Sequence, residues 1–102
     1  MKHLKNYLKN IKITANNLDI AKLVKIEKII FNKIKNNNKI FVCGNGGSAS
    51  VANHFLCDFN KGIKLNSNNK LKPKIISLSD NMETVLAISN DISFNKIFTF
   101  QL

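Results

Sequence analysis

The chain has 102 residues, which allows one domain with a modest core. Its 44% hydrophobic and 22% charged residues are typical of a globular protein and exclude a disordered chain. No apolar run approaches the roughly 20 residues of a membrane helix, and the lysine-rich N-terminus lacks a signal-peptide core, so neither a membrane nor export is expected. Cys43 and Cys57 make no disulfide framework and lie in segments expected to form the core, which favours a reducing, cytoplasmic setting.

The net charge of +10 comes from sixteen lysines and no arginine, set against six acidic residues. The chain also has seventeen asparagines and fourteen isoleucines, so a compositional bias affects its whole length. Proteins that read nucleic acids usually use arginine for bidentate and stacked contacts. The charge therefore does not favour a nucleic-acid partner.

Two amphipathic helices are predicted at residues 1–16 and 18–35, with Asn17 capping the second and Asn36–Asn38 ending it. Their apolar stripes are formed by Leu4, Leu8, Ile11 and Ala15, and by Leu23, Ile26, Ile30 and Ile34. Two strands cannot cover these stripes. We therefore expect residues 1–38 to form a helical pair that packs against another subunit.

The middle of the chain predicts two buried strands separated by a helix. The run Ile40–Cys43 has no polar alternation, which suits a strand buried on both faces of a parallel sheet. It leads directly into Gly44–Ser48 and a helix expected over residues 49–59. A polar, basic loop is expected at 61–74, followed by a second strand at 75–78.

The last quarter predicts a turn and cap at residues 79–81, a helix at 82–88 and a loop at 89–92. Ser93 or Asn95 is expected to cap a final helix that runs to the end of the chain. Alternating strands and helices indicate an α/β fold with a parallel sheet and right-handed crossovers. Since such sheets usually have about five strands, residues 39–102 are expected to be half of a larger, doubly wound domain.

Gly44-Asn45-Gly46-Gly47-Ser48 is the strongest chemical signal. Glycines let the backbone turn sharply, and the amides that open the next helix favour an anion such as phosphate. The run is neither a dinucleotide fingerprint, because Ala49 replaces the last glycine, nor a P-loop, because Gly-Lys-Ser/Thr is absent. A tight turn without a ligand is the alternative.

Two further polar pairs are candidates. His54 and Asp58 are spaced i, i+4 on the predicted helix, where they can share a metal or exchange a proton, or form a plain surface pair. Asn90-Asp91 is read, by itself, as a helix stop with a turn.

The run from Phe41 to Ser50, followed by Ala52-Asn53-His54-Phe55, resembles the first phosphosugar loop of the SIS (sugar isomerase) domain. Within that superfamily the chain most resembles the phosphoheptose isomerases. Segments 76–80 and 89–94, with Gln101, also resemble them. The resemblance covers nearly the whole chain but only the N-terminal half of those isomerases, so the sequence is expected to be a truncated or partial one.

The resemblance implies a role for each matching residue. Asn45, Gly46 and Gly47 would line the sugar-phosphate site with Ser48 beside them, and Asn90 and Asp91 would contact sugar hydroxyls. His54 would be a zinc ligand in metal-containing members. Asp58 falls where the family has a glutamate that is both catalytic base and zinc ligand. Its side chain is one methylene shorter, so it reaches about 1.5 Å less far.

The function that the resemblance implies is isomerisation of sedoheptulose 7-phosphate through an enediol, in a cytoplasmic homotetramer. The alternative is a non-catalytic SIS protein, either an adaptor for a replication initiator or a sugar-phosphate sensor. The expected partner is a sugar phosphate, and this chain alone is expected to be inactive.

Overall fold

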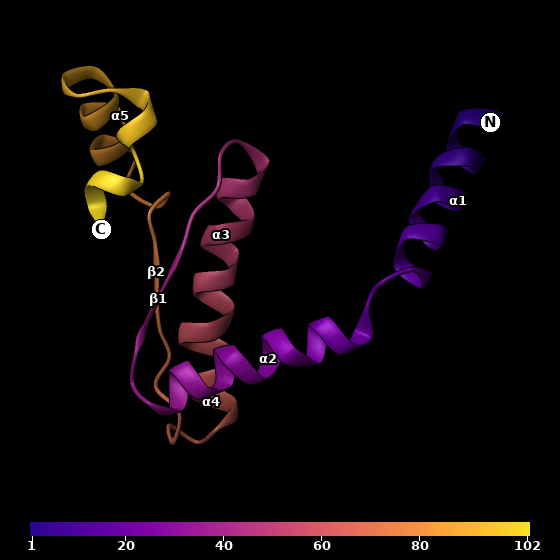
Figure 1. The fold of residues 1–102 in the computed structure, drawn as a ribbon, viewed down its shortest axis with the longest axis horizontal. Helices are drawn as coiled ribbons and strands as arrows, with labels where there is room; N and C mark the ends of the chain where they lie inside the picture. Colours follow the sequence, from indigo (N-terminus) through magenta and orange to yellow (C-terminus); the bar gives the residue numbers. More distant parts are fainter. The chain divides into compact units, whose positions relative to one another are not determined.

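The computed structural model describes residues 1–102, which divide into two compact units, Met1–Ile30 and Phe31–Leu102. Helices and a two-stranded parallel sheet make up the chain, as Figure 1 shows, so the predicted α/β class is confirmed. None of the helices combines the length and the apolar character needed to cross a membrane. The helical pair expected at 1–38 and its role in assembly stay predictions.

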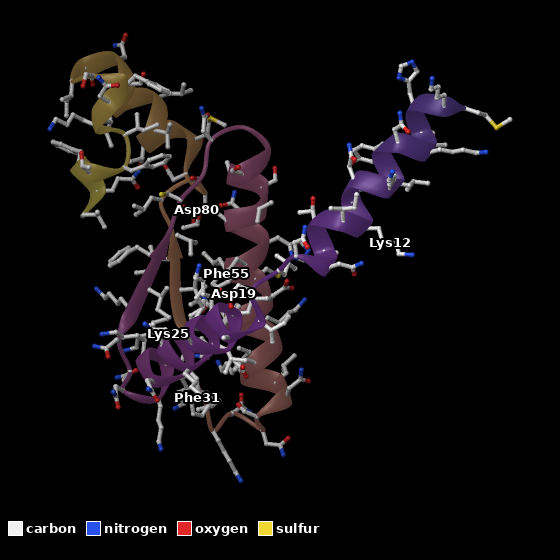
Figure 2. All side chains as sticks on the ribbon, turned by 45° about the vertical axis from the view of Figure 1, so that its right-hand side comes forward. Lys12, Asp19, Lys25, Phe31, Phe55 and Asp80 are labelled. Carbon is white, nitrogen blue, oxygen red and sulfur yellow. The ribbon has the colours of Figure 1, made fainter.

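The first unit holds helix α1, Lys2–Asn16, and most of helix α2, Ile20–Lys35. Both predicted helices are confirmed, but the predicted cap is wrong. Asp19 caps α2, because its carboxylate accepts the Lys22 N–H at 3.1 Å, whereas Asn17 ends α1. No residue of α1 is buried, and the side chain of Lys12 stands away from the helix (Figure 2).

The second unit is built on strands β1, Lys39–Val42, and β2, Lys74–Ser77. The strands run parallel, with Lys39 opposite Lys74 and Val42 opposite Ser77. Helix α3, Gly47–Cys57, packs against both (Figure 1). The buried apolar side chains are those of Ile34, Ala52, Ile75, Leu78, Ile88 and Ile97. The two predicted strands are thus confirmed to within one residue.

The expectation that the first strand is buried on both faces is wrong for this chain. Side chains along β1 alternate between exposed and half-buried, and Phe41 keeps 45% of its surface exposed. A sheet of two strands leaves part of one face without a packed layer. Cys43 and Cys57 are likewise exposed free thiols and do not belong to the core.

The helix that follows the glycine loop is longer than predicted. After α3 the chain continues through a π-helix, η1, Asp58–Ile63, and then α4, Lys64–Asn66, so the loop expected from residue 61 begins only after residue 66. Asn60 explains the wide turn. Its side-chain amide donates to the Ile75 carbonyl at 2.9 Å and its side-chain oxygen accepts the Ile75 N–H at 3.0 Å. The Asn60 side chain thereby takes the place of a neighbouring strand and satisfies the backbone N–H and carbonyl of buried Ile75.

Helix α5, Met82–Asp91, begins where the sequence predicts, with the Asn81 side chain accepting the Thr84 N–H. The loop expected at residues 89–92 is wrong, because the helical hydrogen bonding continues to Ile92, whose N–H donates to the Ile88 carbonyl at 3.0 Å.

The prediction of a final helix is also wrong, because two short 3₁₀ turns take its place: η2, Phe94–Lys96, and η3, Thr99–Gln101. The Gln101 amide donates to the carbonyls of Leu78 at 3.0 Å and Ile97 at 2.6 Å. These two bonds fold the terminal segment back on the end of β2 and favour compact turns over a regular helix.

Candidate functional site

The carboxyl ends of the two parallel strands share one edge of the sheet. The loop Gly44–Ser48 follows β1 at this edge, and Ser79 follows β2. Gly46 precedes α3 with φ 56° and ψ −125°, a conformation that L side chains rarely adopt. Helix α3 then starts at Gly47, so the prediction that Ser48 lies at the start of a helix is confirmed.

The amides of the loop fall into two groups. The N–H of Ser48 donates to the Asn45 carbonyl, and the N–H of Ala49 donates to the Gly46 carbonyl, both at 3.0 Å. The N–H groups of Asn45, Gly46 and Gly47 donate to no protein acceptor. Three free amides beside the positive end of an 11-residue helix form a typical site for an anion.

Ser79, for which the sequence analysis predicted no role at the loop, holds the loop in place. The Ser79 hydroxyl accepts the Gly44 N–H at 3.0 Å and donates to the Gly44 carbonyl at 2.9 Å. Ser77, at the end of β2, donates to the Asn53 side chain of α3 at 2.6 Å and accepts the Ser79 N–H at 3.2 Å. The signal that could have revealed Ser79 is its position, directly after the second of two adjacent parallel strands.

Gly44 is needed because the backbone passes very close to it. A Cβ at this position would fall on the backbone carbonyl of Ser48 and 2.7 Å from the Ala49 nitrogen. At Gly47, by contrast, a Cβ would meet nothing within 4 Å. The loop therefore depends on two of its glycines for different reasons, Gly44 for space and Gly46 for its backbone angle.

A cavity of about 220 Å³ lies beside the loop, between it and the C-terminal elements. It is lined by Gly44, Asn45, Gly46, Ala49, Ser79, Met82, Val85, Phe94, Ile97 and Phe98. One wall thus offers polar backbone groups and the other offers apolar side chains. A ligand with an anionic end and a carbon skeleton matches these two walls.

His54 and Asp58 form a pair further along the α3 axis. The His54 Nδ1 lies 2.9 Å from the Asp58 Oδ2, and the two side chains are 76% and 62% exposed. A hydrogen bond at Nδ1 leaves Nε2 of the imidazole and Oδ1 of the carboxylate free. Neither residue lines the cavity beside the loop.

Asn90 and Asp91 lie in the last turn of α5. The Asn90 side-chain amide donates to the Asp91 carboxylate at 2.9 Å, and both residues are exposed. They do not line the cavity either. The candidate residues therefore occupy three separate places: the loop Asn45–Ser48, the His54–Asp58 pair where α3 passes into η1, and the end of α5.

A metal would find few ligands in this arrangement. No group of three or more His, Cys, Asp or Glu side chains comes together anywhere in the chain. His54 and Asp58 supply two donors, and zinc sites in enzymes usually have three protein ligands. The residues present therefore do not fit zinc by themselves.

The SIS domain model matches residues 2–102, so the chain belongs to the SIS domain family. It is 35% identical over 99 residues to a probable phosphoheptose isomerase of Thermoplasma acidophilum, covering 96% of this chain and 52% of that protein. It is 36% identical over 93 residues to the phosphoheptose isomerase of Shewanella pealeana, covering 89% of this chain and 45% of the relative.

A solved phosphoheptose isomerase from Neisseria gonorrhoeae has a similar structure, with a TM-score of 0.76 and 25% identity. The match covers 98% of this chain and 51% of that one. The chain thus spans about half the length of the relatives it matches. The resemblance inferred from the glycine loop is confirmed at the level of family and fold.

Proposed function

We propose that this chain provides the sugar-phosphate-binding loop of an aldose–ketose isomerase that acts on sedoheptulose 7-phosphate. The observation that carries the proposal is the loop at the carboxyl edge of the sheet, where three amides lack protein acceptors at the start of α3. The names of the relatives, phosphoheptose isomerases, support the substrate.

The phosphate would accept hydrogen bonds from the N–H groups of Asn45, Gly46 and Gly47, beside the Ser48 hydroxyl. The helix dipole of α3 would stabilise its negative charge. His54 follows Gly47 by seven residues, which is about 11 Å along an α-helix. That distance is comparable to the length of an extended seven-carbon sugar, so the far end of the substrate could reach the His54–Asp58 pair.

The reaction needs a base that takes a proton from the hydroxyl-bearing carbon next to the carbonyl, which gives an enediol. Return of the proton to the former carbonyl carbon, with proton transfer between the two oxygens, completes the conversion of ketose to aldose. We propose Asp58 as this base, with its Oδ1 free to act while His54 holds Oδ2. By the family resemblance, Asn90 and Asp91 would bind sugar hydroxyls.

Zinc would require donors from outside these 102 residues, since His54 and Asp58 are the two that this chain offers. We therefore derive no step through a metal. The free thiols of Cys43 and Cys57 match the reducing, cytoplasmic setting that we propose for a sugar-phosphate enzyme.

A non-catalytic SIS protein, an adaptor or a sugar-phosphate sensor, is the second candidate. It is favoured by the aspartate at position 58, which reaches less far than a glutamate, and by the separation of His54 and Asp58 from the cavity. The isomerase and the sensor both bind a sugar phosphate through the loop. They differ in whether a proton is moved.

The proposal is tested by titrating the ¹⁵N-labelled chain with sedoheptulose 7-phosphate and following its amide signals. We expect saturable shifts for Asn45, Gly46 and Gly47 at millimolar ligand or below. Sedoheptulose without the phosphate is the control and should leave these signals unchanged. Equal shifts with both sugars, or none with either, would contradict a phosphate site at the loop.

A further inference from the structure

The amino edge of the sheet, opposite the glycine loop, carries a concentration of lysines. A hollow of about 530 Å³ lies there, lined by Ile34, Lys35, Asn37, Lys70, Leu71 and Lys72. Next to it, Lys39 and Lys74 start the two strands and lie opposite each other in the parallel register. We give the name lysine hollow to this space with its lining residues Lys35, Lys70 and Lys72, together with Lys39 and Lys74 at the strand starts.

No acidic group balances this charge. The ion pairs of the chain are Lys22–Asp19 and His54–Asp58, and neither involves the lysine hollow. Residues 28–57 and 59–79 contain no aspartate or glutamate at all. The five ammonium groups therefore repel one another without a protein partner, which costs stability, above all where Lys39 faces Lys74.

The fold partly explains the position of one of the five lysines. Lys35 is in the last turn of α2, where a positive charge interacts favourably with the helix dipole. The lysines at 39, 70, 72 and 74 lie outside the helices, at the strand starts and on the segment before β2. Their repulsion would be relieved by a bound anion.

We propose that the lysine hollow binds a small compound with two or more linked phosphate groups. Lys35 at the end of α2 and Lys70 and Lys72 before β2 line the space, and lysine binds phosphate as a flexible point charge. Asn37, held at φ 60°, adds an amide side chain at the same wall, while buried Ile34 and half-buried Leu71 form an apolar part of the lining.

A nucleic acid fits this surface less well than a small anion does. The lining has no arginine and no aromatic side chain, which proteins use to stack or to read bases. The hollow is also separate from the sugar-phosphate loop. The four-residue strands place about 13 Å between the two edges of the sheet, so the two ligands would not compete.

The test uses isothermal titration of the full chain with inorganic pyrophosphate at physiological salt, and ¹⁵N amide shifts to locate the site. We expect saturable binding with shifts at Lys70, Leu71 and Lys72. The double variant Lys70→Gln/Lys72→Gln should weaken binding at least about tenfold, since each lost ammonium removes a charge-assisted contact.

The matched control is Lys5→Gln/Lys9→Gln, which removes two exposed lysines from α1 and changes the net charge equally. It should alter pyrophosphate affinity less than about twofold, because Lys5 and Lys9 belong to the other compact unit and do not line the hollow. Equal weakening by both double variants would show a general charge effect and overturn the proposal. Shifts at residues 44–48 in place of 70–72, or binding of a short oligonucleotide but not of pyrophosphate, would overturn it as well.

Discussion

Replacing Gly44 with alanine should loosen the junction between β1 and the glycine loop. The added methyl group would fall on the backbone carbonyl of Ser48 and 2.7 Å from the Ala49 nitrogen. These atoms belong to the first turn of α3 and cannot rotate aside as a side chain could. Either the helix start or the end of β1 has to move.

The magnitude has two parts. Forcing extra volume into a packed site costs about 1–3 kcal/mol. If Gly44 shifts, its two hydrogen bonds with the Ser79 hydroxyl weaken, and each is worth about 1 kcal/mol. A total of about 4 kcal/mol is a large part of the 5–15 kcal/mol that stabilises a typical domain. It corresponds to a fall in Tm of about 15–30 °C for a chain of this size.

Urea and thermal unfolding followed by circular dichroism measure this loss. The control is Gly47→Ala, where the new Cβ meets no atom within 4 Å and alanine is a better helix former. Its unfolding free energy should stay within about 1 kcal/mol of the parent. If Gly44→Ala and Gly47→Ala unfold at the same midpoint, the close approach at Gly44 does not limit the loop and the reasoning fails.

Two further predictions concern activity and assembly. The 102-residue chain should not turn over sedoheptulose 7-phosphate in a coupled assay, because isomerisation needs a base, an acid and an oxyanion stabiliser held together, and no third His, Cys, Asp or Glu joins the His54–Asp58 pair. Turnover that disappears in Asp58→Asn would show that this chain holds a complete site. Light scattering on the protein at micromolar concentration should show an oligomer, and the variant Leu8→Lys should dissociate it. The reason is that α1 has no buried residue and that Leu8 keeps 56% of its surface exposed. A parent protein that is purely monomeric would refute this assembly.

The elements that the sequence predicted well are those with a strong local pattern. The strand Ile40–Cys43, the loop Gly44–Ser48 and the cap at Asn81 each combine a residue type with a fixed local geometry. The misses came from long-range contacts. No local pattern shows that the Gln101 amide reaches the Leu78 carbonyl, 23 residues earlier, and replaces the expected last helix with compact turns.

In the candidate site, too, local patterns predicted some residues and long-range contacts determine the others. The glycine loop was predicted from its position directly after a strand, and the positive φ of Gly46 gives the physical reason for a glycine there. Ser79 was missed as a support of the loop because its role depends on the pairing of β1 with β2, which places it beside Gly44. The separation of Asp58 from the cavity could not be predicted either. Helical spacing shows which residues share one face of a helix, but it does not show what packs against that face.

The π-helix at Asp58–Ile63 has a consequence for how this stretch of chain can change in length. A π turn holds more residues than an α turn, so it shifts the phase of everything that follows it in the helix. Ala52 before it and Asn60 within it can therefore both face the sheet side, the first buried and the second bonded to Ile75. Deleting one residue here would restore a regular α-helix and rotate the Lys64–Asn66 end by about 100°. Insertions and deletions should consequently be tolerated in the loop that follows Asn66, and not in the six residues of the π turn.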